Sequence, residues 1–208
     1  MNNTSTTLHV EGVHVWRGER HVLQGVSFEV GSGELLHIVG SNGAGKTTLL
    51  RVACGLIAPE EGQVFWRGAN IRADRQGFYS ELAFAAHEAA LKADLTGIEN
   101  LRFSVGLKRG VGLHELRDCL ARTGAQEYAE LPARVLSAGQ RRRIAMARVL
   151  ASAVPLWLLD EPFSNLDDAG VQVFAGLIDA HIRQGGTALV VAHHGLEMAG
   201  ARQLRLAA

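Results

Sequence analysis

Cysteine, proline and long apolar runs are all scarce in this sequence of 208 residues. The two cysteines, Cys54 and Cys119, lie far apart, which argues against a framework of disulfides and against a cysteine-based zinc site. The longest apolar stretch, residues 149–159, is interrupted by Ser152 and Pro155 and is too short to cross a bilayer. The first residues contain neither a basic segment nor an apolar one, so we expect no secretion signal and a reducing compartment for the thiols.

An excess of charge of either sign is also lacking. Lys and Arg together number 21, as do Asp and Glu, so no overall basic field attracts nucleic acid and we expect no nucleic-acid partner. Hydrophobic residues make up 47% of the chain and charged residues 20%, which is typical of a globular domain and not of a disordered chain. Glycine is abundant, with 24 residues against 4 prolines, so the positions of the glycines carry information.

Strand-like and helix-like segments alternate at both ends of the chain, and a helical region separates them. The apolar runs 35–39, 156–159 and 187–192 are typical of strands buried on both faces of a parallel sheet. Residues 89–135 have the apolar spacing of helices. The other expected strands are 8–15, 22–30 and 63–67, and the other expected helices are 46–54, 137–151 and 170–183. This order predicts an α/β fold with a parallel core and a helical insertion.

The segment GSNGAGKT, residues 40–47, follows the first buried strand and matches the pattern G-x-x-x-x-G-K-[ST]. Its glycines let backbone N–H groups face an anion, and the positive end of the next helix points to the same place. Lys46 would reach the β- and γ-phosphates of ATP, and Thr47 would offer its hydroxyl to Mg²⁺. The alternative is a glycine-rich turn with an exposed lysine. The candidate ATP-binding residues of this loop are Gly40, Ser41, Asn42, Gly43, Ala44, Gly45, Lys46, Thr47 and Thr48.

An acidic pair, Asp160 and Glu161, ends the buried strand 156–159. Because ligands of open α/β sheets bind at the carboxyl ends of the strands, Asp160 is placed to hold Mg²⁺. Glu161, one residue further on, is placed to accept a proton from the water that attacks the γ-phosphate. The alternative is a solvated strand end, and the phosphate loop favours the catalytic interpretation.

Several further motifs resemble the nucleotide-binding domains of ATP-binding-cassette (ABC) proteins. Residues 136–140, LSAGQ, look like the signature motif of that family, and residues 164–167, SNLD, resemble its D-loop. His193 ends the last buried strand, as the switch histidine of the family does. The resemblance implies one nucleotide-binding domain over residues 1–208, with a helical subdomain at about 89–150. Its expected fold is a P-loop cassette with a mainly parallel core, an antiparallel β subdomain and the helical insertion.

The resemblance also implies a dimer in which each chain binds the ATP of the other. Ser137 is a good helix N-cap, and the small residues after it leave backbone N–H groups exposed at a helix start, which makes a second anion site. In the family, residues at the positions of Ser137, Gly139 and Gln140 face the nucleotide of the second copy. A plain helix cap is the alternative for Ser137. We interpret the basic run 141–143 as a solvated helix face and not as a nucleic-acid site.

Two aromatic side chains are further candidates, and the order of the motifs favours a catalytic role for His193. By the resemblance, Trp16 lies where the family often stacks an aromatic ring on adenine, and a surface or core tryptophan is the alternative. A neutral His193 would hydrogen-bond the γ-phosphate, whereas a lone histidine at a strand end is more often structural.

Glu88 marks a departure from the family. It stands where the family has the Q-loop glutamine, which touches Mg²⁺ and couples to the membrane subunit. A carboxylate at this position can still bind Mg²⁺, but it adds negative charge beside the γ-phosphate. Glu88 is therefore either a third metal ligand with altered coupling or a surface acid.

Finer details are similar to one branch of the family, the ATP-binding subunits of cytochrome c maturation haem exporters. The segment 62–68, GQVFWRG, and the stretch 95–101, LTGIENL, carry this likeness. It implies an ATPase that is peripheral on the cytoplasmic face of a bacterial inner membrane. Its partners would be integral membrane subunits and, indirectly, a periplasmic haem chaperone. The alternatives are an ABC ATPase for another cargo, or a soluble ABC ATPase of DNA repair or translation.

Overall fold

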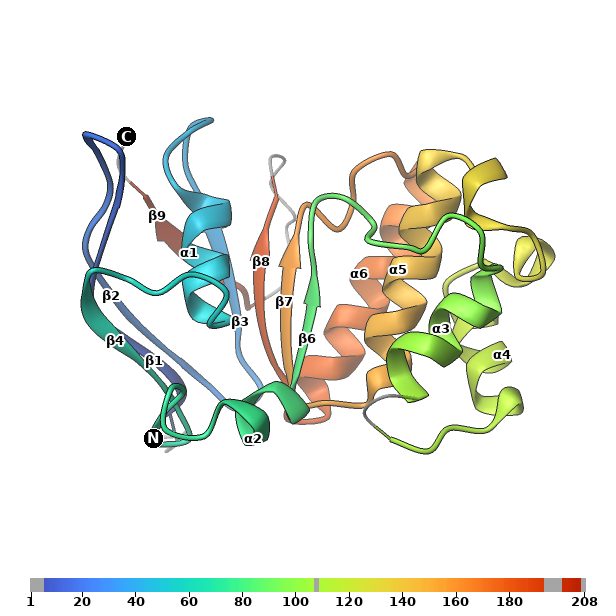
Figure 1. Ribbon diagram of the computed structural model, residues 1–208, viewed down its shortest axis with the longest axis horizontal. Helices are drawn as coiled ribbons and strands as arrows, with labels where there is room; N and C mark the ends of the chain where they lie inside the picture. The colour runs from blue at the N-terminus through green and yellow to red at the C-terminus, as the bar shows by residue number, and fades with distance from the viewer. Residues whose placement is uncertain (1–5, 107–108, 193–199, 207–208) are drawn as a thin grey trace.

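The structure is a computed structural model that describes residues 6–106, 109–192 and 200–206. Two sheets lie side by side, and most helices lie beyond the second sheet (Figure 1). The first sheet is antiparallel and has the strand order β2-β1-β4-β5. Its strands are β1 (Thr6–Arg17), β2 (Arg20–Gly31), β4 (Glu61–Trp66) and β5 (Ala69–Asn70).

The second sheet has five strands in the order β6-β7-β8-β3-β9, and every neighbouring pair is parallel. Its strands are β3 (Leu35–Val39), β6 (Leu82–Ala85), β7 (Leu156–Asp160), β8 (Thr187–Val191) and β9 (Arg202–Arg205). All five residues of both β7 and β8 are buried, because helices or strands cover each face of these central strands.

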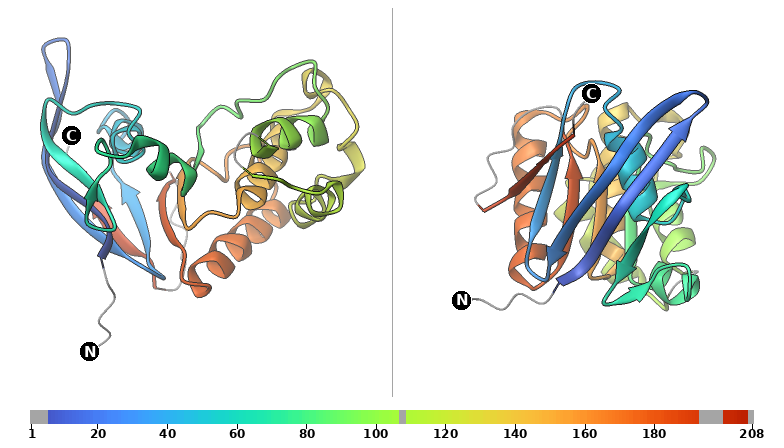
Figure 2. Two further views of the ribbon diagram at one scale, coloured as in Figure 1. Left: turned by 60° about the horizontal axis from the view of Figure 1, so that its bottom comes forward. Right: turned by 90° about the vertical axis from the view of Figure 1, so that its left-hand side faces the viewer.

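The helices fall into two groups. The first, α1 (Lys46–Ala53), lies between the two sheets, as Figure 1 and the left view of Figure 2 show. The remaining helices are α2 (Arg75–Ser80), α3 (Gly97–Gly106), α4 (Leu113–Arg122), α5 (Ala138–Ser152) and α6 (Asp168–Arg183), with 3₁₀ turns at Gln126–Tyr128 and Ala133–Val135. Within the described residues, no helix combines the length and the apolar character that crossing a bilayer requires.

Alternate residues of the parallel strands build two apolar layers. Leu36 and Ile38 face α1 and the antiparallel sheet, whereas Leu35 belongs to the layer beneath α5 and α6. The largest side chain of this second layer that is fully buried is Phe174 of α6. A third apolar cluster joins α3, α4 and α5, with Leu101 and Leu120 fully buried. Helix α5 contributes to both of the last two clusters and so connects the helical end to the sheet.

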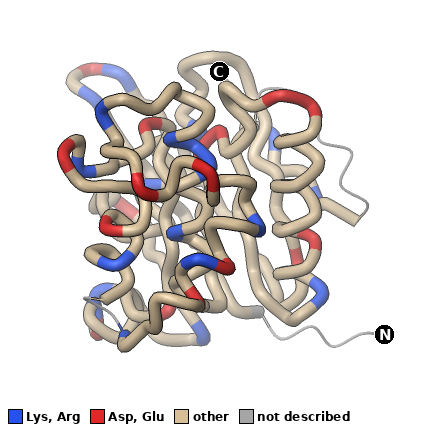
Figure 3. The backbone as a smooth tube through the Cα atoms, turned by 90° about the vertical axis from the view of Figure 1, so that its right-hand side faces the viewer, with Lys and Arg blue, Asp and Glu red and all other residues tan. Residues whose placement is uncertain are grey.

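Charges of both signs are interspersed over the helical end of the molecule (Figure 3). Several make exposed ion pairs, such as Arg117 with Glu130 and Arg134 with Asp94. Such pairs contribute little to stability, so burial in the three apolar clusters accounts for most of it.

The predicted fold class is confirmed: a parallel core, an antiparallel β subdomain and a group of helices between β6 and β7. Two details of the prediction were wrong. The first two strands extend beyond their predicted ranges of 8–15 and 22–30, because Arg17 ends β1 and Arg20 begins β2, so the turn between them is only Gly18–Glu19. Residues 89–96 are not helical; Asn100 holds this segment instead, with its side-chain amide bonded to the carbonyls of Lys92 and Leu95.

A pair of glycines gives a test of the packing. Gly62 has φ +88°, and a Cβ there would lie 2.4 Å from the carbonyl oxygens of Glu11 and Gly12. Gly176, inside α6, has no atom within 4 Å of the same position. We expect Gly62→Ala to lower the free energy of unfolding by about 2–4 kcal/mol. Gly176→Ala, the control, should raise it by about 0.5–1 kcal/mol. Urea unfolding followed by circular dichroism measures both, and equal stability of the two variants would contradict the packing.

Candidate functional site

A glycine-rich loop joins β3 to α1 at the carboxyl edge of the parallel sheet. Gly45 is the N-cap of α1 with φ +95°, and a Cβ there would lie 2.9 Å from side-chain carbons of Val22 and Leu23. Only glycine meets both conditions, the left-handed backbone and the close approach of β2. Gly45 has no side chain to accept the first N–H groups of α1, so these donors are left for an anion.

The lysine of the loop is almost fully buried, with 7% of its surface exposed. Its Nζ donates to the carbonyl oxygens of Gly40 and Ser41, at 2.8 and 3.0 Å. Lys46 thus lies folded back against the loop, where its ammonium group is close to the backbone that would surround a phosphate tail.

Thr47, the residue after Lys46, contacts the first residue of the acidic pair. Thr47 Oγ1 donates to Asp160 Oδ1 at 3.2 Å, across 113 residues of sequence. Asp160 ends β7 and is only 1% exposed. A hydroxyl and a carboxylate in contact at the end of a phosphate-binding loop are the oxygen donors that Mg²⁺ prefers. The structure therefore brings together two of the three predicted metal ligands.

Glu161 follows directly in a left-handed backbone conformation, with φ +51°. Its N–H donates to the carbonyl of Val191 at 2.8 Å, and its own carbonyl accepts from both the N–H and the Oγ of Ser164. A positive φ is unfavourable for a glutamate, so these contacts on either side hold it in place. Residues in this kind of imposed conformation often lie at functional sites.

The first hairpin reaches over the phosphate loop. Arg20 Nη2 donates to the carbonyl of Gly43 at 2.9 Å, and Arg17 and Arg20 line a cavity of about 370 Å³ together with Lys46 and Thr47. Sequence analysis missed both arginines, although two basic residues flanking the hairpin turn were the available signal. They add positive charge to the place where a nucleotide would lie.

Trp16, the residue before Arg17, is stacked on His21 of β2. Their ring centroids are 3.8 Å apart and the planes differ by 9°. His21 in turn bonds His14 through ring nitrogens 3.0 Å apart. The indole is thus held as part of an aromatic stack with His21 and His14, and its predicted contact with adenine stays a prediction.

The predicted signature segment forms the start of α5. Ser137 Oγ accepts the N–H of Gln140 at 3.2 Å, and Gln140 Oε1 accepts the N–H of Ser137 at 2.8 Å, which is a complete capping box. A Cβ on Gly139 would lie 2.5 Å from the carbonyl oxygen of Asn165. Glycine at 139 therefore lets the start of α5 pack directly on the segment 164–167.

The interpretation of residues 141–143 as a solvated helix face was wrong for Arg142. Its side chain is buried, with the residue 4% exposed, and it donates to the carbonyls of Ala86 and His87 and to Ser164 Oγ. Burial lowers the pKa of Arg142, while the nearby carboxylates of Asp160 and Glu161 act to raise it.

Arg143, next along α5, pairs with Asp167 at 2.7 Å. The same carboxylate oxygen caps α6 by accepting the N–H of Gly170 at 3.1 Å. Two neighbouring arginines therefore hold the two ends of the segment 164–167. Periodicity alone did not reveal this, because runs of arginine are usually exposed.

Two predicted site residues, Glu88 and His193, are not found beside Thr47 and Asp160 in the described structure. Glu88 is exposed and lines a cleft of about 470 Å³ with His87, Arg141 and Asn165, and neither Thr47 nor Asp160 lines that cleft. Its predicted role in binding Mg²⁺ remains a prediction. His193 lies outside the described residues.

Comparison with known proteins identifies the family. Residues 23–164 match the family described as "ABC transporter". The cytochrome c biogenesis ATP-binding export protein CcmA of Methylococcus capsulatus is 45% identical over 195 residues, covering 93% of this chain and 94% of that protein. CcmA of Nitrosococcus oceani is 44% identical over all of this chain and 95% of its own length. This chain belongs to the ABC transporter family, in its CcmA branch. It is an ATP-binding ATPase subunit of that family.

Solved structures agree with this assignment. The dimeric bacterial ABC transporter cassette MJ0796 superposes with a TM-score of 0.86 at 27% identity, covering 96% of this chain and 94% of that one. The dimeric post-hydrolysis state of the same cassette, bound to ADP and Pi, gives the same values. Both are similar to this chain in fold over nearly its whole length.

Lys46 provides a direct test of the ATP site. We expect Lys46→Ala to abolish ATP binding, because the phosphate tail loses the positive charge at the base of the loop. Arg51→Ala, which removes an exposed positive charge from the same helix, should bind ATP like the unmodified chain. Isothermal titration with ATP and Mg²⁺ compares the three proteins. Equal affinity of Lys46→Ala and Arg51→Ala would remove Lys46 from the site.

Proposed function

We propose that this ATPase drives the haem export step of cytochrome c biogenesis, as the branch to which it belongs suggests. The observation that carries the proposal is 44–45% identity over nearly full length to cytochrome c biogenesis ATP-binding export proteins. The juxtaposed phosphate loop and acidic pair support ATP hydrolysis as its chemical step. In this proposal residues 1–208 form one nucleotide-binding domain, with a helical subdomain at about 89–150.

Hydrolysis needs an oriented phosphate tail and an activated water. The N–H groups at the start of α1 and the Lys46 ammonium would hold the β- and γ-phosphates. The Glu161 carboxylate would accept a proton from the attacking water, and His193 would hydrogen-bond the γ-phosphate. Trp16 would stack on the adenine. The roles of Lys46 and Glu161 follow from their positions in the family motifs and in the fold, and those of His193 and Trp16 from the family motifs alone.

The residues around Thr47 suit a hard divalent cation. Thr47 Oγ1 and Asp160 Oδ1 lie 3.2 Å apart at the end of the loop, and Asp160 is nearly fully buried. Oxygen donors with room for phosphate oxygens are what Mg²⁺ takes in nucleotide sites. When bound, Mg²⁺ would neutralise charge on the phosphates. Glu88 is the proposed third ligand, and its charge would distinguish this site from one with a glutamine there.

A second copy would complete the site. The capping box at Ser137 satisfies the N–H groups of Ser137 and Gln140, and no residue of α5 lines the cavity at the phosphate loop of the same chain, so the remaining N–H groups at the start of α5 are proposed to meet the ATP of the other copy. Ser137, Gly139 and Gln140 would provide that contact. MJ0796, which is similar in fold over nearly all of this chain, is described as dimeric.

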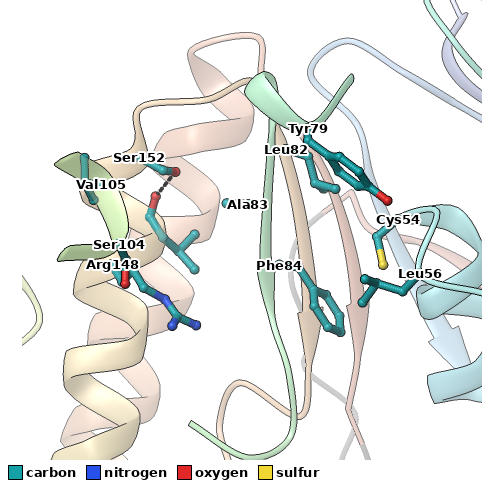
Figure 4. Close-up of a pocket in the computed structure, with 11 residues that line it drawn as sticks. Cys54, Leu56, Tyr79, Leu82, Ala83, Phe84, Ser104, Val105, Arg148 and Ser152 are labelled. Carbon is teal, nitrogen blue, oxygen red and sulfur yellow. Dashed lines mark hydrogen bonds between the residues drawn. The ribbon is translucent and has the colours of Figure 1, made fainter. Parts of the chain in front are cut away.

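An apolar cleft gives the proposed place for an integral membrane subunit. It has a volume of about 400 Å³ and lies between the edge strand β6 and helices α3 and α5, near the end of α1 (Figure 4). Leu56, Tyr79 and Phe84 line it on the side of the sheets, while Val105 and Arg148 come from the helices. Leu56 is 60% exposed, which suits a partner that covers it. The chain would thus be peripheral at the cytoplasmic face of the inner membrane.

The shared site predicts how the chain assembles. We expect Glu161→Gln to bind ATP but to stop turnover, since the amide cannot take a proton from water, and to form a stable dimer with ATP and Mg²⁺. Adding Ser137→Arg should block that dimer by bulk and charge while leaving ATP affinity nearly intact. Light scattering with and without ATP measures the mass. The same mass in both conditions for Glu161→Gln would contradict the shared site, and normal turnover would reject Glu161 as the base.

The cargo is tested in cells. We expect a strain that lacks this chain to lose c-type cytochromes, and we expect the unmodified chain, but not Glu161→Gln, to restore them. Tagged chain purified from detergent-solubilised membranes should bring integral membrane subunits of the cytochrome c biogenesis system with it. Normal levels of c-type cytochromes in the deletion strain, together with recovery of another transporter, would favour an ABC ATPase for another cargo.

A further inference from the structure

The buried guanidinium of Arg142 connects three parts of the chain that lie far apart in sequence. It extends from the second turn of α5 and donates to the carbonyl of Ala86 at 2.9 Å, to the carbonyl of His87 and to Ser164 Oγ at 2.9 Å. A buried arginine is stable only when its donors are satisfied, and these acceptors come from the segments after β6 and after β7. Arg142 therefore holds the carboxyl ends of both neighbouring strands.

One of these contacts leads to the acidic pair. The Ser164 hydroxyl that accepts from Arg142 donates to the carbonyl of Glu161 at 3.0 Å. Glu161 has a left-handed backbone, and the carbonyl of Val191 fixes its N–H from the other side. The conformation of Glu161 thus depends on a chain of hydrogen bonds that begins at Arg142. Because a small displacement of a catalytic base reduces the rate strongly, this chain matters for turnover.

The other contacts lead to the cleft of Figure 4. Ala86 and His87 directly follow β6, whose Leu82, Ala83 and Phe84 line that cleft. Glu88 comes next in the chain. A movement of β6 or of the segment 86–88 therefore displaces the guanidinium of Arg142, which also bonds Ser164. No other described side chain donates hydrogen bonds both to the carbonyls of 86–87 and to Ser164.

We propose that Arg142 is a positioning residue for ATP hydrolysis, which holds Glu161 in place through Ser164 and couples it to the segment 86–88. The proposal rests on the mechanism proposed above, in which Glu161 is the base of ATP hydrolysis. Arg142 acts on the base through Ser164 and is not among the residues that line the cavity at the phosphate loop, so its loss lowers the rate of hydrolysis and leaves ATP binding intact. A lysine keeps the charge but reaches fewer acceptors, so it restores part of the function.

Arg109 supplies the matched control. Its guanidinium donates to the carbonyl of Ala151, near the end of α5, at 2.7 Å and pairs with Glu115. It is a partly buried arginine that bonds a backbone carbonyl, as Arg142 does, but its contact is near the end of α5, whereas Arg142 lies near the start. Replacing it tests the effect of losing such contacts on stability alone.

The experiment measures steady-state ATP hydrolysis by the full chain with Mg²⁺. We expect Arg142→Gln to lower kcat by about tenfold to a hundredfold with KM for ATP within about twofold, and Arg142→Lys to recover part of the loss. Ser164→Ala should lower kcat as well, and the double variant should be no slower than Arg142→Gln, because both changes break one chain of hydrogen bonds. Arg109→Gln should keep kcat and lower only the unfolding temperature.

The outcomes separate this proposal from the proposed function. ATP hydrolysis by the unmodified chain that Glu161→Gln abolishes supports the function whatever Arg142 does. If Arg142→Gln is folded and its kcat is unchanged, or if its loss lies in KM, the positioning role is rejected. Losses of Arg142→Gln and Ser164→Ala that multiply in the double variant also reject it. If Arg142→Gln does not fold, Arg142→Lys and Ser164→Ala decide, and normal kcat in both rejects the role.

Discussion

The parallel pairing of β3, β8 and β7 is the constraint on which the rest of this structure depends. Parallel strands end at the same edge of the sheet, so the loop after β3 and the acids after β7 must meet there. The contact between Thr47 and Asp160 is the direct result. The same pairing lets the carbonyl of Val191, at the end of β8, accept the N–H of Glu161. Backbone pairing deep in the core thus sets the geometry of the nucleotide site.

Much of this could be predicted from sequence, because the relevant signals are local. The buried strands are short continuous apolar runs, and the glycines and the lysine of residues 40–47 identify the phosphate loop. The edges of the parallel sheet could not be predicted in the same way. Strand β9, RQLR, is polar and mostly exposed, and β6, LAFA, is only four residues long. Both are strands only because a neighbouring strand offers them hydrogen bonds, which no local pattern reports.

The residues of the candidate site also divide into those with a local sequence signal and those that depend on long-range packing. Gly45, Lys46, Asp160 and Glu161 belong to contiguous motifs, so their proximity followed from the order of strands. Arg142 was misjudged, since a run of three arginines on a helix is normally solvated, and only the packing of α5 against two loops buries its middle member.

Helix α5 shows why such long-range contacts bear on function. Its apolar residues pack on both the sheet and the helical cluster, so the helix cannot move independently of either. At its start, Gly139 lies against Asn165, Arg142 bonds Ser164 and Arg143 pairs with Asp167. The start of α5 and the segment 164–167 therefore behave as one rigid unit. Anything that binds at the N-terminus of α5 acts on the backbone that holds Glu161, and whatever displaces β6 reaches the same backbone through Arg142.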